Sequence, residues 1–282
     1  MSHQDVLIHA LAAEGAVRVL ATEVSDAAET GRRSHGLGRD ASVLLAEGSV
    51  ATTLLSAYLK GDERVLLQIQ LERPRAAFLG DVGADGTLRL RLTPADVRIP
   101  ADHRLDGILL AIKSDSDREV YRGHSTIDHS TLEQALRDHL ATSNQVDVVL
   151  RIGTRLDEAG QVAFAGGLLV ERLPEDPEQP SLEREAFLDR FSSLERADVE
   201  ALMVELASGG LAGGEAVVLE HRPVSWCCRC SLERVESMLV GLGREELQSL
   251  AAEQGEAEVT CHFCNTTYRV DGDRLDELIA ST

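Results

Sequence analysis

All five cysteines of this 282-residue chain lie in its last fifth, in two tight groups. The first group holds Cys227, Cys228 and Cys230, and the second holds Cys261 and Cys264. Four thiolates in two closely spaced pairs make up the tetrahedral ligand set of a structural Zn²⁺ site, because this soft cation prefers sulfur. The cysteine pattern therefore predicts a small metal-binding domain at the C-terminal end of the chain.

The first group allows two ligand pairs. Cys227-x-x-Cys230 would repeat the spacing of Cys261-x-x-Cys264, whereas Cys228-x-Cys230 is one residue shorter. Spacing alone does not choose between them. His262 lies inside the second group, but four cysteines already complete a tetrahedral shell, so we expect His262 to be an exposed spacer.

The residues around the cysteines resemble a known family. Residues 226–234 read Trp-Cys-Cys-Arg-Cys-Ser-Leu-Glu-Arg, and Cys-His-Phe-Cys follows after about thirty residues. This arrangement resembles the 33 kDa chaperonin family of redox-regulated heat-shock holdases, which carries Cys-x-Cys-Ser-x-Glu-Arg, a helical spacer and Cys-x-x-Cys. The resemblance implies four zinc ligands and leaves Cys227 as an additional thiol. The implied ligands are Cys228, Cys230, Cys261 and Cys264.

The resemblance also implies a function. In the family, the reduced, zinc-bound protein is inactive, and oxidants such as hypochlorous acid, or peroxide with heat, convert the four ligands to two disulfides and release the zinc. The zinc domain and the linker before it then unfold and expose apolar surface. The protein dimerises and holds unfolding client proteins without ATP. We therefore expect a chaperone and not an enzyme.

The implied disulfides, Cys228–Cys230 and Cys261–Cys264, would restore little of the lost stability. They close loops of one and two intervening residues, so they remove little entropy from the unfolded chain. A structural zinc site contributes on the order of 10 kcal/mol to folding, whereas a small domain has a net stability of only about 5 kcal/mol. Oxidation is therefore expected to unfold the zinc domain.

Two other functions would use the same cysteines. One is a constitutive zinc ribbon that serves as an adaptor for nucleic acid or protein, and the other is a thiol–disulfide oxidoreductase based on Cys261-x-x-Cys264. The formal charge of −20, from 28 basic and 48 acidic side chains, disfavours binding to a phosphate backbone. A redox-active Cys-x-x-Cys normally opens a helix, whereas we expect a strand after this pair.

The N-terminal residues carry no pattern of a targeting or membrane segment. The first residues are polar, and the apolar stretch after them is interrupted by Glu14 and Arg18. No run approaches the roughly 20 apolar residues of a membrane span. We expect a cytoplasmic protein that binds neither membrane nor nucleic acid. Thiols are normally reduced in the cytoplasm, which favours metal binding or redox sensing over structural disulfides.

Composition and pattern divide the chain into three parts. These are an N-terminal domain over 1–173, a proline-rich boundary and helical linker over 174–216, and a zinc-binding redox-switch domain over 217–282. In the N-terminal domain, strands joined mainly by hairpins predict an α+β fold rather than a doubly wound parallel sheet. The expected helices cover 40–59 and 131–140, and the expected strands cover 16–24, 64–71, 78–82, 87–92, 146–152 and 162–170.

The linker carries two apolar stripes at helical spacing, and we expect helix from 181 to about 220 with glycine interruptions at 209–210 and 213–214. Short helices of this kind are marginal without packing. We expect the stripes to dock on the N-terminal domain in the resting state and to bind clients after release. The stripe residues are Phe187, Phe191, Leu194, Val199, Leu202, Met203 and Leu206.

The zinc domain is expected to contain two short helices around 241–243 and a strand over 256–260. Its apolar residues are few, so we expect the metal to supply much of its folding free energy.

Overall fold

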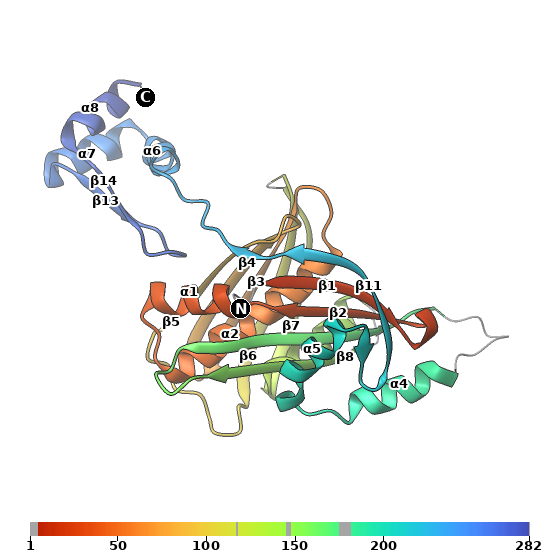
Figure 1. The fold of residues 1–282 in the computed structure, drawn as a ribbon. Coiled ribbons are helices and arrows are strands. Elements are labelled where there is room, and N and C mark those ends of the chain that lie inside the picture. The colour runs from red at the N-terminus through yellow and green to blue at the C-terminus, as the bar shows by residue number, and fades with distance from the viewer. Residues whose placement is uncertain (1–4, 117, 145–147, 175–181, 282) are drawn as a thin grey trace. The chain divides into compact units, whose positions relative to one another are not determined.

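The computed structural model describes residues 5–116, 118–144, 148–174 and 182–281 (Figure 1). The chain forms two compact units, Met1–Cys227 and Cys228–Thr282. The first unit thus includes residues 217–227, which the sequence analysis assigned to the zinc domain. Most of the proline-rich boundary, residues 175–181, lies outside the described part of the chain.

The described residues of the first unit form two six-stranded sheets. Sheet one has the order β10-β11-β1-β2-β9-β8, and its strands pair in antiparallel fashion. Its strands are β1 (Val6–Ala12), β2 (Val17–Glu23), β8 (Val148–Leu156), β9 (Val162–Arg172), β10 (Gly210–Leu211) and β11 (Gly214–Pro223).

Sheet two has the order β12-β5-β4-β3-β6-β7, and only the short β12–β5 pair is parallel. Its strands are β3 (Glu63–Arg73), β4 (Ala76–Gly83), β5 (Thr87–Thr93), β6 (Leu105–Asp115), β7 (Arg118–Ser130) and β12 (Ser225–Trp226). The dominance of hairpin connections confirms the α+β class.

Helices α1 (Ser25–His35) and α2 (Arg39–Leu55) contribute to the main core, which draws buried residues from both sheets. Helix α2 contacts β8 and β9 of sheet one and β3, β4 and β5 of sheet two. The expectation that no run approaches a membrane span is wrong by length and composition, because Arg39–Tyr58 could cross a membrane on these grounds. However, 83% of its apolar window is buried within this unit. It is the central core helix of the unit. A third helix, α3 (Leu132–His139), begins at the N-cap Thr131, whose hydroxyl accepts from the Gln134 amide.

The N-terminus of α1 is capped from a distant position. The side chain of Asp5, before β1, accepts hydrogen bonds from the backbone amides of Asp26 and Ala27 at 3.0 and 2.7 Å. The Asp5 carbonyl also accepts from the Val224 amide at 2.9 Å. One residue thus ties together the start of β1, the start of α1 and the chain that follows β11. Burial raises the pKa of Asp5 to about 6, although the two backbone hydrogen bonds act in the opposite direction.

A second core lies on the other face of sheet one. It is covered by α4 (Leu182–Ser192), the short 3₁₀ turn η4 (Arg196–Asp198) and α5 (Val199–Ala207). All seven stripe residues pack in this core. The docking of the stripes on the N-terminal domain is therefore confirmed.

The expectation of helix up to about residue 220 is wrong after α5. Gly209 and Gly213 have positive φ values of 81° and 74°, which favour glycine and turn the chain into the β10–β11 hairpin. Strand β11 then pairs along β1, with Ala12 opposite Ala216 and Ala10 opposite Val218. Without β11 the backbone groups of β1 on that side would lack partners, so long-range pairing overrides the local pattern.

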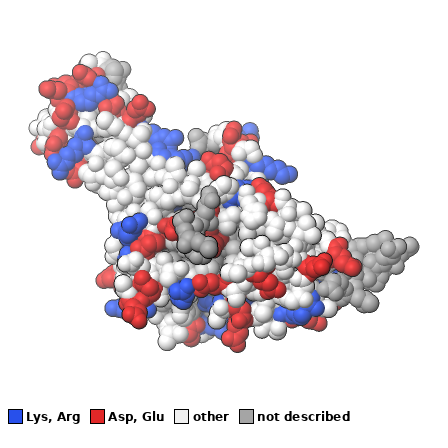
Figure 2. All heavy atoms as spheres, viewed as in Figure 1, with Lys and Arg blue, Asp and Glu red and all other residues white. Residues whose placement is uncertain are grey.

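The second unit contains three helices and a hairpin. They are α6 (Leu232–Gly241), α7 (Arg244–Gln254), β13 (Ala257–Thr260), β14 (Thr267–Val270) and α8 (Gly272–Ser281). Both expected helices and the expected strand are present. Its small core has eight buried apolar side chains: Val235, Leu239, Leu247, Ala257, Val270, Leu275, Leu278 and Ile279. On the face in Figure 2, acidic side chains lie among the basic ones on both units.

Candidate metal centre

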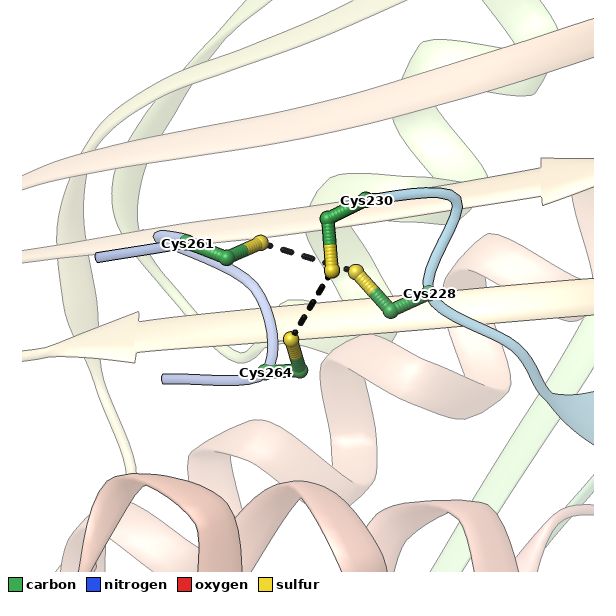
Figure 3. A group of neighbouring side chains, drawn as sticks. All are labelled: Cys228, Cys230, Cys261 and Cys264. Carbon is green, nitrogen blue, oxygen red and sulfur yellow. Dashed lines mark hydrogen bonds between the residues drawn. The ribbon is translucent and has the colours of Figure 1, made fainter. Parts of the chain in front are cut away.

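Four cysteine sulfurs meet in the second unit (Figure 3). The sulfurs of Cys228 and Cys261 are 3.5 Å apart, those of Cys230 and Cys264 are 3.3 Å apart, and all four lie within 4.8 Å of one another. All four residues are partly buried, whereas Cys227 is exposed and lies outside this group. The structure thus brings together the four sulfurs that the family resemblance implies.

The second cysteine pair is held by a tight turn after β13. The Asn265 amide donates to the Cys261 carbonyl, and the Cys261 amide donates to the Thr266 carbonyl, both at 2.9 Å. Asn265 has a φ of 56°, a left-handed conformation that asparagine tolerates better than most residues. Strand β14 follows the turn, so the pair does not open a helix.

The first pair is fixed by the start of α6. Ser231 is the N-cap of this helix, and its hydroxyl accepts from the Arg234 amide at 3.2 Å. Cys230 therefore comes immediately before a capped helix end. On the other side, the Cys227 amide donates to the Leu88 carbonyl of β5 at 2.8 Å. The Cys228-x-Cys230 pair thus follows directly after the contact of Cys227 with β5, and it ends just before Ser231, the N-cap of α6.

Two hydroxyls contact the cluster. Tyr268 donates to the Cys230 sulfur at 3.1 Å, and the Thr266 hydroxyl is hydrogen-bonded to the Cys264 sulfur at 3.2 Å. Burial raises the pKa of both Cys228 and Cys230. Partial burial acts in the same direction on Cys264, but hydrogen bonds from Thr266 and the neighbouring thiols lower its pKa to about 6. The bond to Cys230 raises the pKa of Tyr268 to about 12.

The size of the cluster fits one metal ion. A tetrahedron with metal–sulfur distances of about 2.3 Å has sulfur–sulfur edges of about 3.8 Å, and the sulfurs here are separated by 3.3 Å to at most 4.8 Å. Among the residues that the structure describes, the donors of this group are four sulfurs, a set that selects a soft or borderline cation. The cluster could therefore hold a single metal ion of this type.

The docked segment, residues 182–207, is a second candidate feature. Phe187 and Phe191 are fully buried and stack on each other, with ring centroids 6.2 Å apart and planes 13° from parallel. Val199 and Leu206 are also fully buried, and Leu194 is half-buried. The largest apolar side chains of this segment are therefore hidden in the second core of the first unit.

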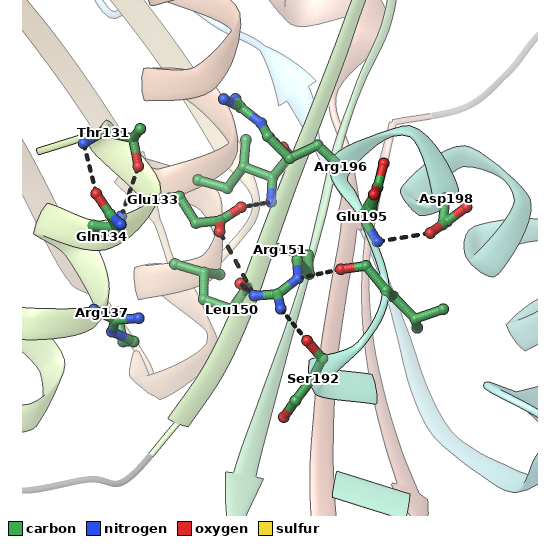
Figure 4. A network of polar contacts seen from close by, with 12 residues as sticks. Thr131, Glu133, Gln134, Arg137, Leu150, Arg151, Ser192, Glu195, Arg196 and Asp198 are labelled. Atoms are coloured by element: carbon green, nitrogen blue, oxygen red, sulfur yellow. Dashed lines mark hydrogen bonds and ion pairs between the residues drawn. The ribbon is translucent and has the colours of Figure 1, made fainter. Parts of the chain in front are cut away.

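An ionic network holds the middle of the docked segment, and Figure 4 shows its part around Arg151 and Glu133. Arg196 forms an ion pair with Glu47 of α2 and donates to the Ile152 carbonyl at 2.8 Å. The Glu47 side chain is only 5% exposed. From the other side, Arg151 of β8 donates to the carbonyls of Leu194 and Ser192 at 2.8 and 2.7 Å. The turn between α4 and α5 is thus held by charged hydrogen bonds as well as by apolar contacts.

Glu133 of α3 completes this network. Its carboxylate accepts from the Ile152 amide at 2.8 Å and lies 3.6 Å from the Arg151 guanidinium. Burial raises the pKa of Glu133 despite these favourable contacts. The sequence analysis did not identify the network. Its one sequence signal is Glu47, the only charged residue between Ala41 and Leu55.

Comparison with known proteins agrees with these features. The profile of the family described as Hsp33 protein matches residues 5–271. The chain belongs to the Hsp33 family. Among curated relatives, the 33 kDa chaperonin of Bacillus subtilis (strain 168) is 29% identical over 284 residues, covering 97% of this chain and 98% of that protein. The 33 kDa chaperonin of Geobacillus sp. (strain WCH70) is 30% identical over 285 residues, covering 97% of each.

A solved structure matches the fold over its full length. The crystal structure of the 33 kDa chaperonin from Thermotoga maritima superposes with a TM-score of 0.82 at 21% identity, and the match covers 99% of both chains. The resemblance stated from the cysteine motif is therefore confirmed, as is the architecture of a large α+β part followed by a small four-cysteine part. Membership in the Hsp33 family supports a chaperone role.

Proposed function

We propose that this chain is a redox-regulated, ATP-independent holdase whose resting form binds one Zn²⁺ through the four clustered cysteines. The proposed ligands are Cys228, Cys230, Cys261 and Cys264. The observation that carries the proposal is the convergence of these sulfurs from two segments more than thirty residues apart. Membership in the Hsp33 family supports it.

The metal would supply charge neutralisation and a cross-link between the two cysteine turns. The second unit has 55 residues, from Cys228 to Thr282, and eight buried apolar side chains. A core of this size rarely supplies more than about 3–5 kcal/mol, so the metal's contribution of roughly 10 kcal/mol would decide whether the unit is folded.

Oxidation would remove this contribution by consuming the ligands. A thiolate attacks a hydroperoxide, an S–O bond forms, the O–O bond breaks and hydroxide leaves. A neighbouring thiolate then attacks the sulfenic acid, an S–S bond forms and a second hydroxide leaves. The proposed products are Cys228–Cys230 and Cys261–Cys264, and neither sulfur of a disulfide provides the thiolate that binds zinc.

Release of the docked segment would follow from the loss of the second unit. Helices α4 and α5 have 11 and 9 residues, too short to be stable apart from their packing. We propose that the linker, residues 174–216, detaches from sheet one in the oxidised protein and presents Phe187, Phe191 and the other stripe residues to clients. The buried apolar stripe supports this role, since such side chains bind unfolding proteins only when exposed.

The proposal includes the cellular context. The partners would be unfolding client proteins and, in the oxidised state, a second copy of the chain. We propose a cytoplasmic location, no binding of nucleic acid or membrane, and no enzymatic turnover. The redox-switch domain at 217–282 would respond as one part, although β11 belongs to the first compact unit.

The test combines zinc release with an aggregation assay on the full-length protein. Hydrogen peroxide at raised temperature should release one zinc per chain, seen with a chromogenic chelator, and only the oxidised protein should suppress aggregation of a thermally unfolding client. Retention of zinc under oxidation would favour the constitutive adaptor. Turnover of an insulin-type disulfide substrate would favour the oxidoreductase.

A further inference from the structure

Two hydroxyl groups reach the sulfur cluster from the same short segment, and they contact different cysteine pairs. Tyr268 donates to Cys230, and the Cys264 thiol donates to the Thr266 hydroxyl. A Cys264 thiolate has no proton to donate, so in that state the Thr266 hydroxyl is the donor. The two sulfurs that receive these contacts are neighbours, 3.3 Å apart. One member of each cysteine pair is therefore hydrogen-bonded to a hydroxyl.

The hairpin, rather than the sulfur, positions the Tyr268 hydroxyl. Tyr268 lies within β14 opposite Val259 of β13, and its ring packs against the core of the second unit. Its neighbour Thr267 pairs with Thr260 across the hairpin, with their hydroxyls 3.0 Å apart. The tyrosine hydroxyl is thus held at Cys230 by the same pairing that shapes the second cysteine turn.

We propose that Tyr268, with Thr266 at the other pair, sets how readily this cysteine cluster is oxidised. A thiolate reacts with a hydroperoxide through a sulfur lone pair: two electrons pass from sulfur to the O–O bond, an S–O bond forms and hydroxide leaves. A hydrogen bond to that sulfur withdraws electron density from it. The bonded thiolate is therefore a weaker nucleophile, by about threefold for each unit by which its basicity falls.

This inference rests on the proposed function, because it concerns the rate of the oxidation that the proposed switch requires. It adds that the four sulfurs differ in reactivity, because the hydrogen bonds from the two hydroxyls slow the attack of Cys230 and Cys264 on the oxidant. Tyr268 would thus lower the oxidation rate of the first cysteine pair, and Thr266 would lower that of the second.

The test uses the full-length, reduced, zinc-loaded protein and the variant Tyr268→Phe, which keeps the ring and removes the hydroxyl. Hydrogen peroxide and, in a separate series, iodoacetamide are the probes, and peptide mass spectrometry gives the modification rate of each cysteine. We expect the rate at Cys230 to rise about threefold or more relative to Cys228, with faster zinc release by peroxide. Thr266→Val should produce the same change at Cys264.

Thr267→Val is the matched control, because it removes a hydroxyl from the same strand that contacts Thr260 and no sulfur. It should leave all rate ratios unchanged. An unchanged Cys230-to-Cys228 ratio in Tyr268→Phe would overturn the inference, as would an equal rise at all four cysteines, which indicates a loosened fold.

These outcomes separate the inference from the function on which it rests. If wild-type protein releases zinc and holds clients while the ratios stay unchanged, the redox switch stands and the role of Tyr268 fails. If wild-type protein neither releases zinc nor holds clients, the redox switch fails, and the iodoacetamide ratios still decide the role of Tyr268. Should Tyr268→Phe not retain zinc, Thr266→Val provides the comparison at Cys264.

Discussion

Substitution of Phe191 by alanine should release the docked segment without any oxidant. The Phe191 side chain is fully buried and stacks on Phe187 against sheet one. Truncating a buried phenylalanine costs about 3–5 kcal/mol in protein cores. A loss of 3 kcal/mol corresponds to somewhat more than a hundredfold increase in the population of the open segment, since each 1.4 kcal/mol is about tenfold.

Hydrogen exchange of the reduced, zinc-loaded protein measures this opening directly. In Phe191→Ala, amides of α4 and α5 should lose about two orders of magnitude in protection, while α2 and the strands of sheet two keep theirs. The reduced variant should also suppress client aggregation. Val204→Ala is the control, because the Val204 side chain lies on α5 but is 67% exposed. Unchanged protection of α4 in Phe191→Ala, or an even loss across the whole first unit, would refute the idea of a separately releasable segment.

Three further predictions concern other parts of the chain. Cys227→Ser should retain one zinc per chain by elemental analysis and should still be activated by oxidant, whereas Cys228→Ser should lose the metal. Equal loss of zinc from both variants would contradict the proposed ligand set. Arg196→Met should lower the free energy of unfolding by about 3–5 kcal/mol, because it leaves Glu47 buried and unpaired, and adding Glu47→Leu should recover much of this loss in urea titrations. The folded Asp5 carboxyl, with its pKa raised from 3.8 to about 6, holds its proton more tightly than the unfolded one. Ionisation of Asp5 should therefore lower the free energy of unfolding by up to about 3 kcal/mol as the pH rises from about 4 to above 6. Asp5→Asn should remove this dependence of stability on pH. An identical pH dependence in both proteins would show that Asp5 does not titrate in this way.

The sulfur cluster could be predicted from the sequence because its information is local. Cysteine is rare in this chain, and its two groups indicate a four-sulfur site. The spacing left Cys227 and Cys228 as alternatives, and only the residues around them favoured Cys228. The helices and hairpins of the first unit were also predictable where their patterns are strong, as in α2 and the β4–β5 hairpin. These elements depend on neighbours within a few residues.

What sequence reasoning missed depends on partners far along the chain. Strand β11 was expected to be helix, and its strand form rests on pairing with β1, about two hundred residues earlier. The Glu47–Arg196 pair joins residues 149 positions apart, and no local sequence pattern indicates that they pair. The contact of Tyr268 with Cys230 spans 38 positions and likewise needs the β13–β14 hairpin to be in place. Such contacts follow from topology, which local patterns do not determine.

At the boundary between the two units, a long-range sheet contact and the local cysteine motif involve neighbouring residues. Cys227 is the last residue of the first unit, and its amide is bound to β5, whereas Cys228 is the first residue of the second unit and lies in the sulfur cluster. One peptide bond therefore separates a sheet contact from a proposed metal ligand. The exposed Cys227 lies outside the four-sulfur group, whereas Cys228 and Cys230 both belong to it. The arrangement of the sulfurs therefore favours Cys228-x-Cys230 over Cys227-x-x-Cys230, a choice that the two spacings alone leave open.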